Sequence, residues 1–187
     1  KKVVRVGDSA VAVVADTWWH AKTALDALPI EWDYGVNVAA SSTTFAAVMK
    51  AGLDANDAVV GNAVGDAKAA IAAAPRKIEA VYSYPHQNHA TMETMNATAR
   101  YTPERCEVWT PTQNGEAALA AAAEASGLPL AKCEVYKLLL GGGFGRRGAV
   151  HDWVRQAVAI AKEMPGTPVK LIWSREEDMT HGRYHPA

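Results

Sequence analysis

The chain has 187 residues, 49% of them hydrophobic, and a formal net charge of −1. This length suits one ordinary domain or two small ones, with enough apolar residues for a buried core. The balanced charge and the absence of a basic stripe exclude an electrostatic case for nucleic-acid binding. No apolar run is long enough to span a bilayer, and the first residues are typical of a strand rather than a signal peptide.

The N-terminal region is predicted to form a hairpin followed by a helix. Apolar residues over 3–15 predict two short strands around a Gly-Asp turn. Residues 18–28 have apolar positions at helical spacing, with Asp16 or Thr17 as the N-cap. Residues 29–33, which begin with a proline, are predicted to start another strand.

The region from 36 to 77 has weak periodicity and many small residues, which indicates a connection with two short helices, at 45–51 and 66–74. Beyond residue 77 the pattern sharpens into alternating strands and helices. The predicted strands are 78–84, 97–102, 106–110, 132–140 and 169–173, and the predicted helices are 113–126 and 149–164. This order favours an α+β fold of mixed sheets with packed helices over a regularly alternating parallel sheet.

The glycine-rich run from Gly141 to Gly145, followed by Arg146 and Arg147, lies between an apolar strand and a helix. Consecutive glycines bring backbone N–H groups close to a ligand, and the following helix and the arginines add positive charge. The run therefore suits a phosphate or another electron-rich oxygen group. It is neither a P-loop nor a GxGxxG fingerprint, because Arg146 follows Gly145 and Gly148 comes too late. A glycine-rich bend with two solvated arginines is the alternative.

Two other segments carry polar residues at strand ends. Residues 84–96 include His86, His89 and Glu93, but their spacing does not match a zinc site, so no protein-ligated metal is predicted. Residues 110–114 join a strand to a helix, where a simple cap would explain them. The two cysteines, Cys106 and Cys133, lie in separate predicted strands and are interpreted as buried thiols; a disulfide between them remains open.

Together these segments resemble the molybdopterin-binding subunit of the molybdenum hydroxylases, the xanthine dehydrogenase and isoquinoline oxidoreductase family. The resemblance covers nearly the whole chain, and its joint pattern is more specific than any single motif. The matching segments are His89–Glu93, Ala99–Tyr101, Trp109–Gln113, Gly141–Gly145, Trp173–Met179, Tyr184–Pro186 and, from the domain that precedes the cofactor domains, Val6–Trp32.

Within the family, Arg146 and Arg147 and the C-terminal segments resemble the isoquinoline oxidoreductase and membrane-associated aldehyde dehydrogenase branch. Purine-oxidising members carry a glutamate where Gly148 stands here, which disfavours xanthine as the substrate. Two positions depart from the family pattern: Thr94 replaces a usual proline, and Ala97 replaces a common cysteine. Both departures are interpreted as packing changes.

The resemblance implies a cofactor site in which dithiolene sulfurs, and no protein side chain, hold the molybdenum. It implies that Gln113 donates to the apical oxo ligand. It also implies that the backbone N–H groups around Gly143, Phe144 and Gly145, with Gly142 beside them, face the metal's oxo or sulfido ligands or the pterin. Arg146 is expected to contact the pterin or its phosphate. The cofactor is expected in its cytosine dinucleotide form.

The implied reaction is hydroxylation of an aldehyde or an N-heterocycle such as isoquinoline, with oxygen taken from water. Electrons would leave through an iron–sulfur (2Fe–2S) small subunit, with a cytochrome c as a further acceptor. The family's glutamate base lies in a segment that has no match here, so no catalytic residue is assigned. The chain is therefore expected to be an internal piece, inactive and without bound cofactor when isolated. The resemblance places the parent in the bacterial periplasm or at the membrane, with the cytoplasm as the alternative.

The implied organisation has three parts. Residues 1–35 would be the end of the preceding α/β domain, 36–77 a connection, and 78–187 part of the first molybdenum-cofactor-binding domain. We expect residues 1–35 to pack separately from 78–187. The competing function is a non-catalytic domain that binds an anionic ligand, such as a phosphate, through the glycine-rich loop.

Overall fold

The computed structural model describes residues 2–186, which divide into two compact units. The larger unit combines the residues up to Ile30 with residues 87–185, and the smaller contains residues 31–86 and Pro186. The larger unit contains, in chain order, β1 (Lys2–Val6), β2 (Ala10–Val14), α1 (Trp18–Asp26), β4 (Asn96–Thr102), β5 (Arg105–Pro111), α4 (Gly115–Ser126), a 3₁₀ turn η2 (Leu130–Lys132), β6 (Cys133–Leu138), α5 (Asp152–Lys162), β7 (Val169–Ile172) and α6 (Arg175–Thr180). The two-residue strands β3 (His86–Gln87) and β8 (His185–Pro186) lie at the sequence boundaries between the units.

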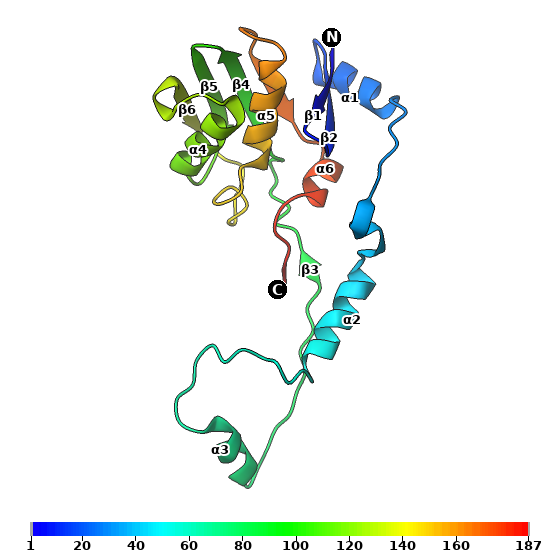
Figure 1. The fold of residues 1–187 in the computed structure, drawn as a ribbon, viewed down its shortest axis with the longest axis vertical. Helices are drawn as coiled ribbons and strands as arrows, with labels where there is room; N and C mark the ends of the chain where they lie inside the picture. Colours follow the sequence, from blue (N-terminus) through cyan, green and yellow to red (C-terminus); the bar gives the residue numbers. More distant parts are fainter. Residues whose placement is uncertain (1, 187) are drawn as a thin grey trace. The chain divides into compact units, whose positions relative to one another are not determined.

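A four-stranded mixed sheet with the order β6-β5-β4-β7 is the base of the larger unit (Figure 1). Strand β4 runs antiparallel to both β5 and β7. Strands β5 and β6 are parallel, with Val108 opposite Val135, because α4 carries the chain back between them. The expected hairpin of β4 and β5 and the expected α+β class with mixed sheets and packed helices are confirmed.

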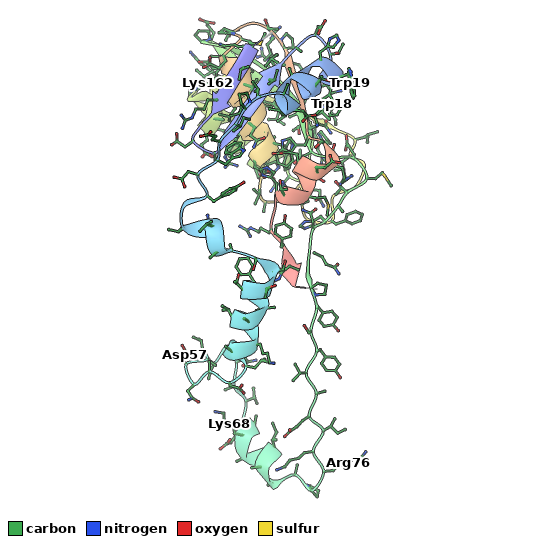
Figure 2. The ribbon with its side chains drawn as sticks, turned by 90° about the vertical axis from the view of Figure 1, so that its right-hand side faces the viewer. Trp18, Trp19, Asp57, Lys68, Arg76 and Lys162 are labelled. Carbon is green, nitrogen blue, oxygen red and sulfur yellow. The ribbon has the colours of Figure 1, made fainter. Side chains whose placement is uncertain are left out.

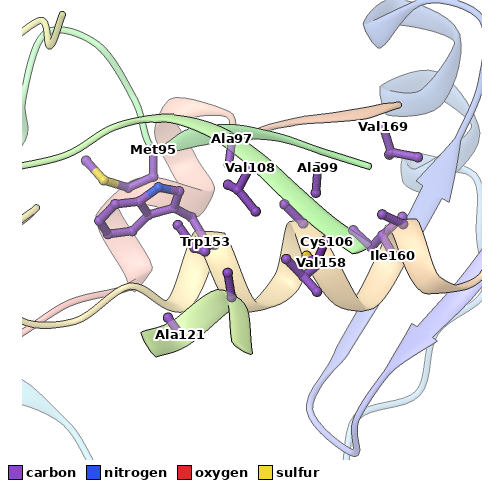
Figure 3. Close-up of a cluster of buried hydrophobic side chains, with 14 of the residues drawn as sticks. Met95, Ala97, Ala99, Cys106, Val108, Ala121, Trp153, Val158, Ile160 and Val169 are labelled. Atoms are coloured by element: carbon purple, nitrogen blue, oxygen red, sulfur yellow. The ribbon is translucent and has the colours of Figure 1, made fainter. Parts of the chain in front are cut away.

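Helices α4 and α5 form the second layer, with α5 packed on β4 and α4 packed on β6 and α5. Alternation along β4 buries Ala97 and Ala99, and the amphipathic α5 buries Trp153, Val154 and Val158 among others. Figure 3 shows these side chains meeting between α5 and the strands. Because the alanine side chains of β4 are small, α5 lies close to the sheet. Close packing there gives many favourable van der Waals contacts.

The N-terminal hairpin belongs to this core rather than to a unit of its own. Val4 of β1 is buried in the core cluster, and β1 contacts α5. The Trp18 indole donates to the carbonyl of Ile172 at 3.0 Å, and Lys2 Nζ lies 2.7 Å from Glu163 Oε2. The prediction that residues 1–35 pack separately from 78–187 is therefore wrong. One hairpin and one helix cannot bury a core alone, and α1 has no buried residue.

Several predicted elements have different bounds in the structure. Residues 29–33 and 78–84, both predicted strands, form no strand, and Ile78 and Val81 are 84% and 77% exposed. An alternating pattern becomes a strand only when a partner strand satisfies its backbone, and these segments have none among residues 2–186. Helices α4 and α5 begin at Gly115 and Asp152, two and three residues later than predicted. Helix α6 was not predicted, although its N-cap Ser174 accepts from the Glu177 N–H.

The smaller unit has local structure but no core. It contains a 3₁₀ helix η1 (Gly35–Ala39), α2 (Ser42–Gly52) and α3 (Ala67–Ala73). Ser41 and Thr44 form a capping box on α2, and Asp66 caps α3. No residue between 31 and 86 is buried, and Figure 2 shows side chains such as Asp57, Lys68 and Arg76 projecting from a single run of backbone. Over residues 2–186, no helix has the length and hydrophobicity needed to cross a membrane.

Candidate functional site

Three segments that are distant in sequence meet at the glycine-rich loop between β6 and α5. The Glu93 N–H donates to the carbonyl of Gly141 at 3.1 Å, and the Gln113 N–H donates to the carbonyl of Arg147 at 3.1 Å. The loop is therefore held between the end of β5 and the segment that leads into β4. The expectation of a turn between a strand and a helix at Gly142–Gly145 is confirmed, since these residues lie outside any regular helix. Phe144 and Gly145 are exposed, Gly142 is partly buried and Gly143 is buried, and contact of the loop with a ligand stays a prediction.

The glycines of the loop are required for two different physical reasons. A Cβ on Gly141 would lie 2.6 Å from Glu93 Cβ, and one on Gly143 would lie 2.5 Å from Gln113 Cδ, so only glycine fits. Gly142 and Gly145 instead have φ angles of +98° and +95°, which L-residues rarely adopt. Within five residues, the loop therefore passes close to Glu93 and Gln113 and turns through left-handed backbone conformations.

Phe144 adopts a left-handed conformation although it is not glycine. Its φ angle is +53°, and its side chain is 77% exposed. A bulky residue in this region of φ costs free energy, and such strain concentrates at ligand-binding loops.

The Gln113 side chain is held directly against the loop. Its Oε1 accepts from the Gly145 N–H at 3.1 Å and from the Arg147 N–H at 3.2 Å. Two donors can meet only the carbonyl oxygen of the amide, so Nε2 is the group left to donate elsewhere, and it forms no hydrogen bond within residues 2–186. The prediction that the Gln113 side chain lies beside the loop is confirmed, while a shared ligand site stays a prediction. Gln113 does not itself begin the helix, because Asn114 is the N-cap of α4.

Three consecutive backbone donors in the loop are without a protein acceptor. The N–H groups of Gly141, Gly145 and Arg147 bind side-chain oxygens of Glu93 and Gln113. By contrast, those of Gly142, Gly143 and Phe144 form no hydrogen bond in the described part of the chain. Together with Gln113 Nε2, they make a cluster of donors suited to electron-rich oxygen atoms. We call this cluster the donor nest.

The two arginines after the loop are buried, so the alternative with two solvated arginines is wrong. Arg146 is 4% exposed, and its Nη2 lies 3.0 Å from both carboxylate oxygens of Asp152. Its guanidinium also lies over the rings of Trp153 and Trp173, at 5.3 and 5.6 Å. Arg147 is fully buried and paired with Glu93. Both charges are therefore neutralised within the fold, and the sequence held no signal for their partners.

The histidines and cysteines do not form a metal centre. Among residues 2–186, no group of three or more His, Cys, Asp or Glu side chains is placed to hold a metal ion. Cys106 and Cys133 are opposite each other on β5 and β6 but are not bonded. Cys106 is buried as predicted, and Cys133 is partly buried. Burial raises the pKa of the Cys106 thiol to about 11, so this group is a packing residue rather than a nucleophile.

His181 connects α6 to the buried Arg146–Asp152 pair. Its ring lies 2.8 Å from Glu177 Oε1, 3.7 Å from Asp152 Oδ2, and against Trp173 at 4.3 Å between ring centroids. The hydrogen bond to Glu177 raises the pKa of His181 above its ordinary value of 6.5, and the carboxylate charges act in the same direction. Folding therefore strengthens proton binding at His181.

We expect His181→Gln to destabilise the chain in a pH-dependent way. Because the folded pKa is raised, the contribution of protonated His181 is fully present below about pH 6.5 and is lost as pH rises through the folded pKa. The difference in unfolding free energy between wild type and variant should be larger at about pH 5.5 than at about pH 8.5. Urea unfolding at both values measures it. If the difference in unfolding free energy grew with pH, the proposed role of protonated His181 would be wrong. His151, whose pKa is lowered by burial, is present in both proteins and contributes equally to both.

Residues 52–187 match the family described as the molybdopterin cofactor-binding domain. The chain belongs to this family. Rat xanthine dehydrogenase/oxidase is 30% identical to it over 193 aligned residues, which cover 99% of the chain and 14% of that protein. The membrane-bound aldehyde dehydrogenase [pyrroloquinoline-quinone] of Gluconacetobacter polyoxogenes is 28% identical over 177 residues, covering 90% and 22%.

Among solved structures, quinoline 2-oxidoreductase from Pseudomonas putida superposes with a TM-score of 0.55 at 25% identity. The match covers 60% of the chain and 14% of that protein. The resemblance to the molybdenum hydroxylases is thus confirmed, and the relatives of this chain are oxidoreductases. The chain spans about a fifth or less of the length of the relatives it matches.

Proposed function

We propose that the chain forms one wall of the molybdenum-cofactor site of an oxidoreductase that hydroxylates an aldehyde or an N-heterocycle. The observation that carries the proposal is the donor nest, in which three adjacent backbone N–H groups and Gln113 Nε2 have no acceptor within residues 2–186. A backbone N–H that is shielded from water needs an acceptor, and a bound ligand would supply one to these donors. Preorganised donors of this kind bind and stabilise electron-rich groups without further reorganisation.

Each residue of the predicted site has a specific place in the proposal. Gln113 Nε2 and the N–H groups of Gly142, Gly143 and Phe144 would donate to the cofactor. Gly145 would act indirectly, because its N–H holds Gln113 Oε1. Arg146 was expected to contact the pterin or its phosphate, but it is buried and its Nη2 is bound to Asp152, so we leave it out of the donor set. When bound, the cofactor, in the proposed cytosine dinucleotide form, supplies two-electron oxidation chemistry that protein side chains lack.

The proposed substrates and partners rest on the relatives and on the loop. Two relatives are named for an aldehyde and a quinoline, which supports an aldehyde or N-heterocycle for the parent protein. Gly148 offers no side chain where the purine-oxidising members carry a glutamate, which disfavours xanthine. The proposal also includes oxygen derived from water, an iron–sulfur partner subunit and a cytochrome c acceptor. It places the parent protein in the periplasm or at the membrane, with the cytoplasm as the alternative.

We expect Gln113→Leu in the full-length parent to lower kcat/KM for an aldehyde roughly 10- to 150-fold. A hydrogen bond to a charged or electron-rich group contributes about 1.5–3 kcal/mol, which corresponds to that range. Dye-reduction kinetics and molybdenum content, measured by elemental analysis, test the effect. Gln87→Leu, at an exposed glutamine on β3, is the control and should behave as wild type.

Two results would contradict this proposal. Full activity and full molybdenum content in the Gln113→Leu parent would remove Gln113 from the site. A wild-type parent that contains no molybdenum, but binds inorganic phosphate in a way that Gln113→Leu weakens, would favour the non-catalytic anion-binding domain instead.

A further inference from the structure

We infer that the buried Arg147 and the partly exposed Glu93 form a positioning pair that holds the glycine-rich loop against Gln113 and thereby sets the geometry of the donor nest. This inference rests on the proposed function for its catalytic consequence. Neither residue would touch the substrate or the reacting atoms. The pair would act through the loop backbone and through Gln113, which are the groups that face the cofactor.

The Arg147 guanidinium joins the three segments of the site. Its Nε donates to the carbonyl of Gly142 at 2.9 Å, and its Nη1 donates to the carbonyl of Pro111 at 3.4 Å. Its Nη2 reaches the Glu93 carbonyl at 2.7 Å, Glu93 Oε2 at 3.0 Å and the Thr94 carbonyl at 3.4 Å. One planar fork therefore fixes the loop, the end of β5 and the segment before β4 relative to one another.

The backbone of Arg147 orients Gln113 directly. The Arg147 N–H donates to Gln113 Oε1 at 3.2 Å, and the Arg147 carbonyl accepts from the Gln113 N–H at 3.1 Å. The Thr112 hydroxyl also donates to the same carbonyl at 3.1 Å. A displacement of Arg147 would therefore move the Gln113 amide and the loop together.

Glu93 completes the brace from the opposite side. Its Oε2 accepts from the Gly141 N–H at 2.9 Å as well as from Arg147, and its Oε1 accepts from Asn96 Nδ2 at 3.0 Å. The carboxylate is thus occupied by donors on both oxygens and is not available as a general base. Glu93 holds Gly141, the first glycine of the loop, and the Arg147 guanidinium holds Gly142 through the Gly142 carbonyl.

The loop needs such a brace for a physical reason. Glycines lose more conformational freedom on folding than other residues, so a loop with four of them is ordered only if other groups hold it. Burying the Arg147 charge is itself unfavourable, and desolvation lowers its pKa, although Glu93 opposes that shift. A buried charge that contacts three segments of one site serves to position them more than to stabilise the fold.

The test uses Arg147→Lys and Glu93→Gln in the full-length, cofactor-loaded parent. Both variants should retain molybdenum, while kcat falls roughly 10- to 100-fold and KM changes less than about twofold, because donors displaced by about 1 Å lose transition-state stabilisation. The electron paramagnetic resonance spectrum of the partly reduced molybdenum centre should change shape. The control is Glu107→Gln, which removes a buried carboxylate paired with Arg100 at 2.7 Å, but on β5 and without contact to the loop.

Every outcome bears on the inference. If Arg147→Lys and Glu93→Gln load molybdenum and keep the kinetics and spectrum of wild type, the inference is wrong although the proposed function stands. If Arg147→Lys does not fold, Glu93→Gln, which keeps the arginine, decides the question alone. If the wild-type parent holds no molybdenum, the proposed function fails, and hydrogen exchange still tests the brace in this chain. The hydrogen-bonded amides of Gly145, Arg146 and Arg147 should then exchange at least about tenfold faster in Glu93→Gln, and unchanged rates would overturn the inference.

Discussion

Gly143→Ala in the parent oxidoreductase is expected to lower kcat/KM roughly 100- to 1,000-fold, the loss typical of removing a preorganised donor group. The new methyl group would lie 2.5 Å from both Cδ and Oε1 of Gln113. The Gln113 amide cannot move aside freely, because its Oε1 is bound by two N–H groups of the loop. Either the amide or the loop must therefore shift, and both belong to the donor nest.

Steady-state kinetics with an aldehyde and molybdenum content measure this effect. Gly115→Ala is the matched control, because a Cβ there meets no atom within 4 Å and its φ is not positive. It adds the same methyl group two residues from Gln113 and should leave kcat/KM within about twofold. Comparable activity of the two variants would contradict the steric role of Gly143.

Trp153→Ala is expected to lower the unfolding free energy of the chain by about 3–5 kcal/mol, the usual cost of truncating a large buried aromatic residue. The Trp153 side chain is fully buried between α5 and the sheet (Figure 3). Its indole donates to Thr110 Oγ1 at 2.8 Å, and the Arg146 guanidinium lies over its ring. Truncation would leave a cavity, remove the donor to the Thr110 hydroxyl oxygen, and take away one of the two aromatic rings beside Arg146.

Urea unfolding followed by circular dichroism measures the loss. Trp153→Phe keeps most of the packing and loses the indole hydrogen bond, so we expect a smaller cost of about 1–2 kcal/mol. Trp19→Ala removes the same side chain from a position that is 68% exposed and should change stability by less than about 0.5 kcal/mol. A cost for Trp153→Ala no greater than that for Trp19→Ala would contradict the core assigned to α5.

The elements with strong periodicity were predictable because their apolar spacing alone selects helix or strand. The hairpin of β1 and β2, the hairpin of β4 and β5, and helix α5 all follow from such patterns. Residues 78–84 show the limit of this reasoning. They alternate like a strand, yet a strand depends on a partner that the local sequence does not specify.

The site was predictable in part. Gln113 and the glycine-rich loop were correctly predicted to lie together, because both belong to the motifs that carry the family resemblance. The partners of Arg146 and Arg147 were not predictable, since Asp152 and Glu93 are ordinary residues until the fold brings them within 3.0 Å. The separate packing expected for residues 1–35 failed for the same reason: only the structure shows that Val4 belongs to the core of α5.

The burial of Val4 against α5 has a consequence for the order of events during protein synthesis. Strands β1 and β2 are synthesised before α5, which begins about 140 residues later. At about 5–20 residues per second, translation of that interval takes roughly 7–28 s. During this time α5, against which Val4 packs, does not yet exist. We therefore expect the hairpin to dock on α5 late in the cotranslational folding of the larger unit.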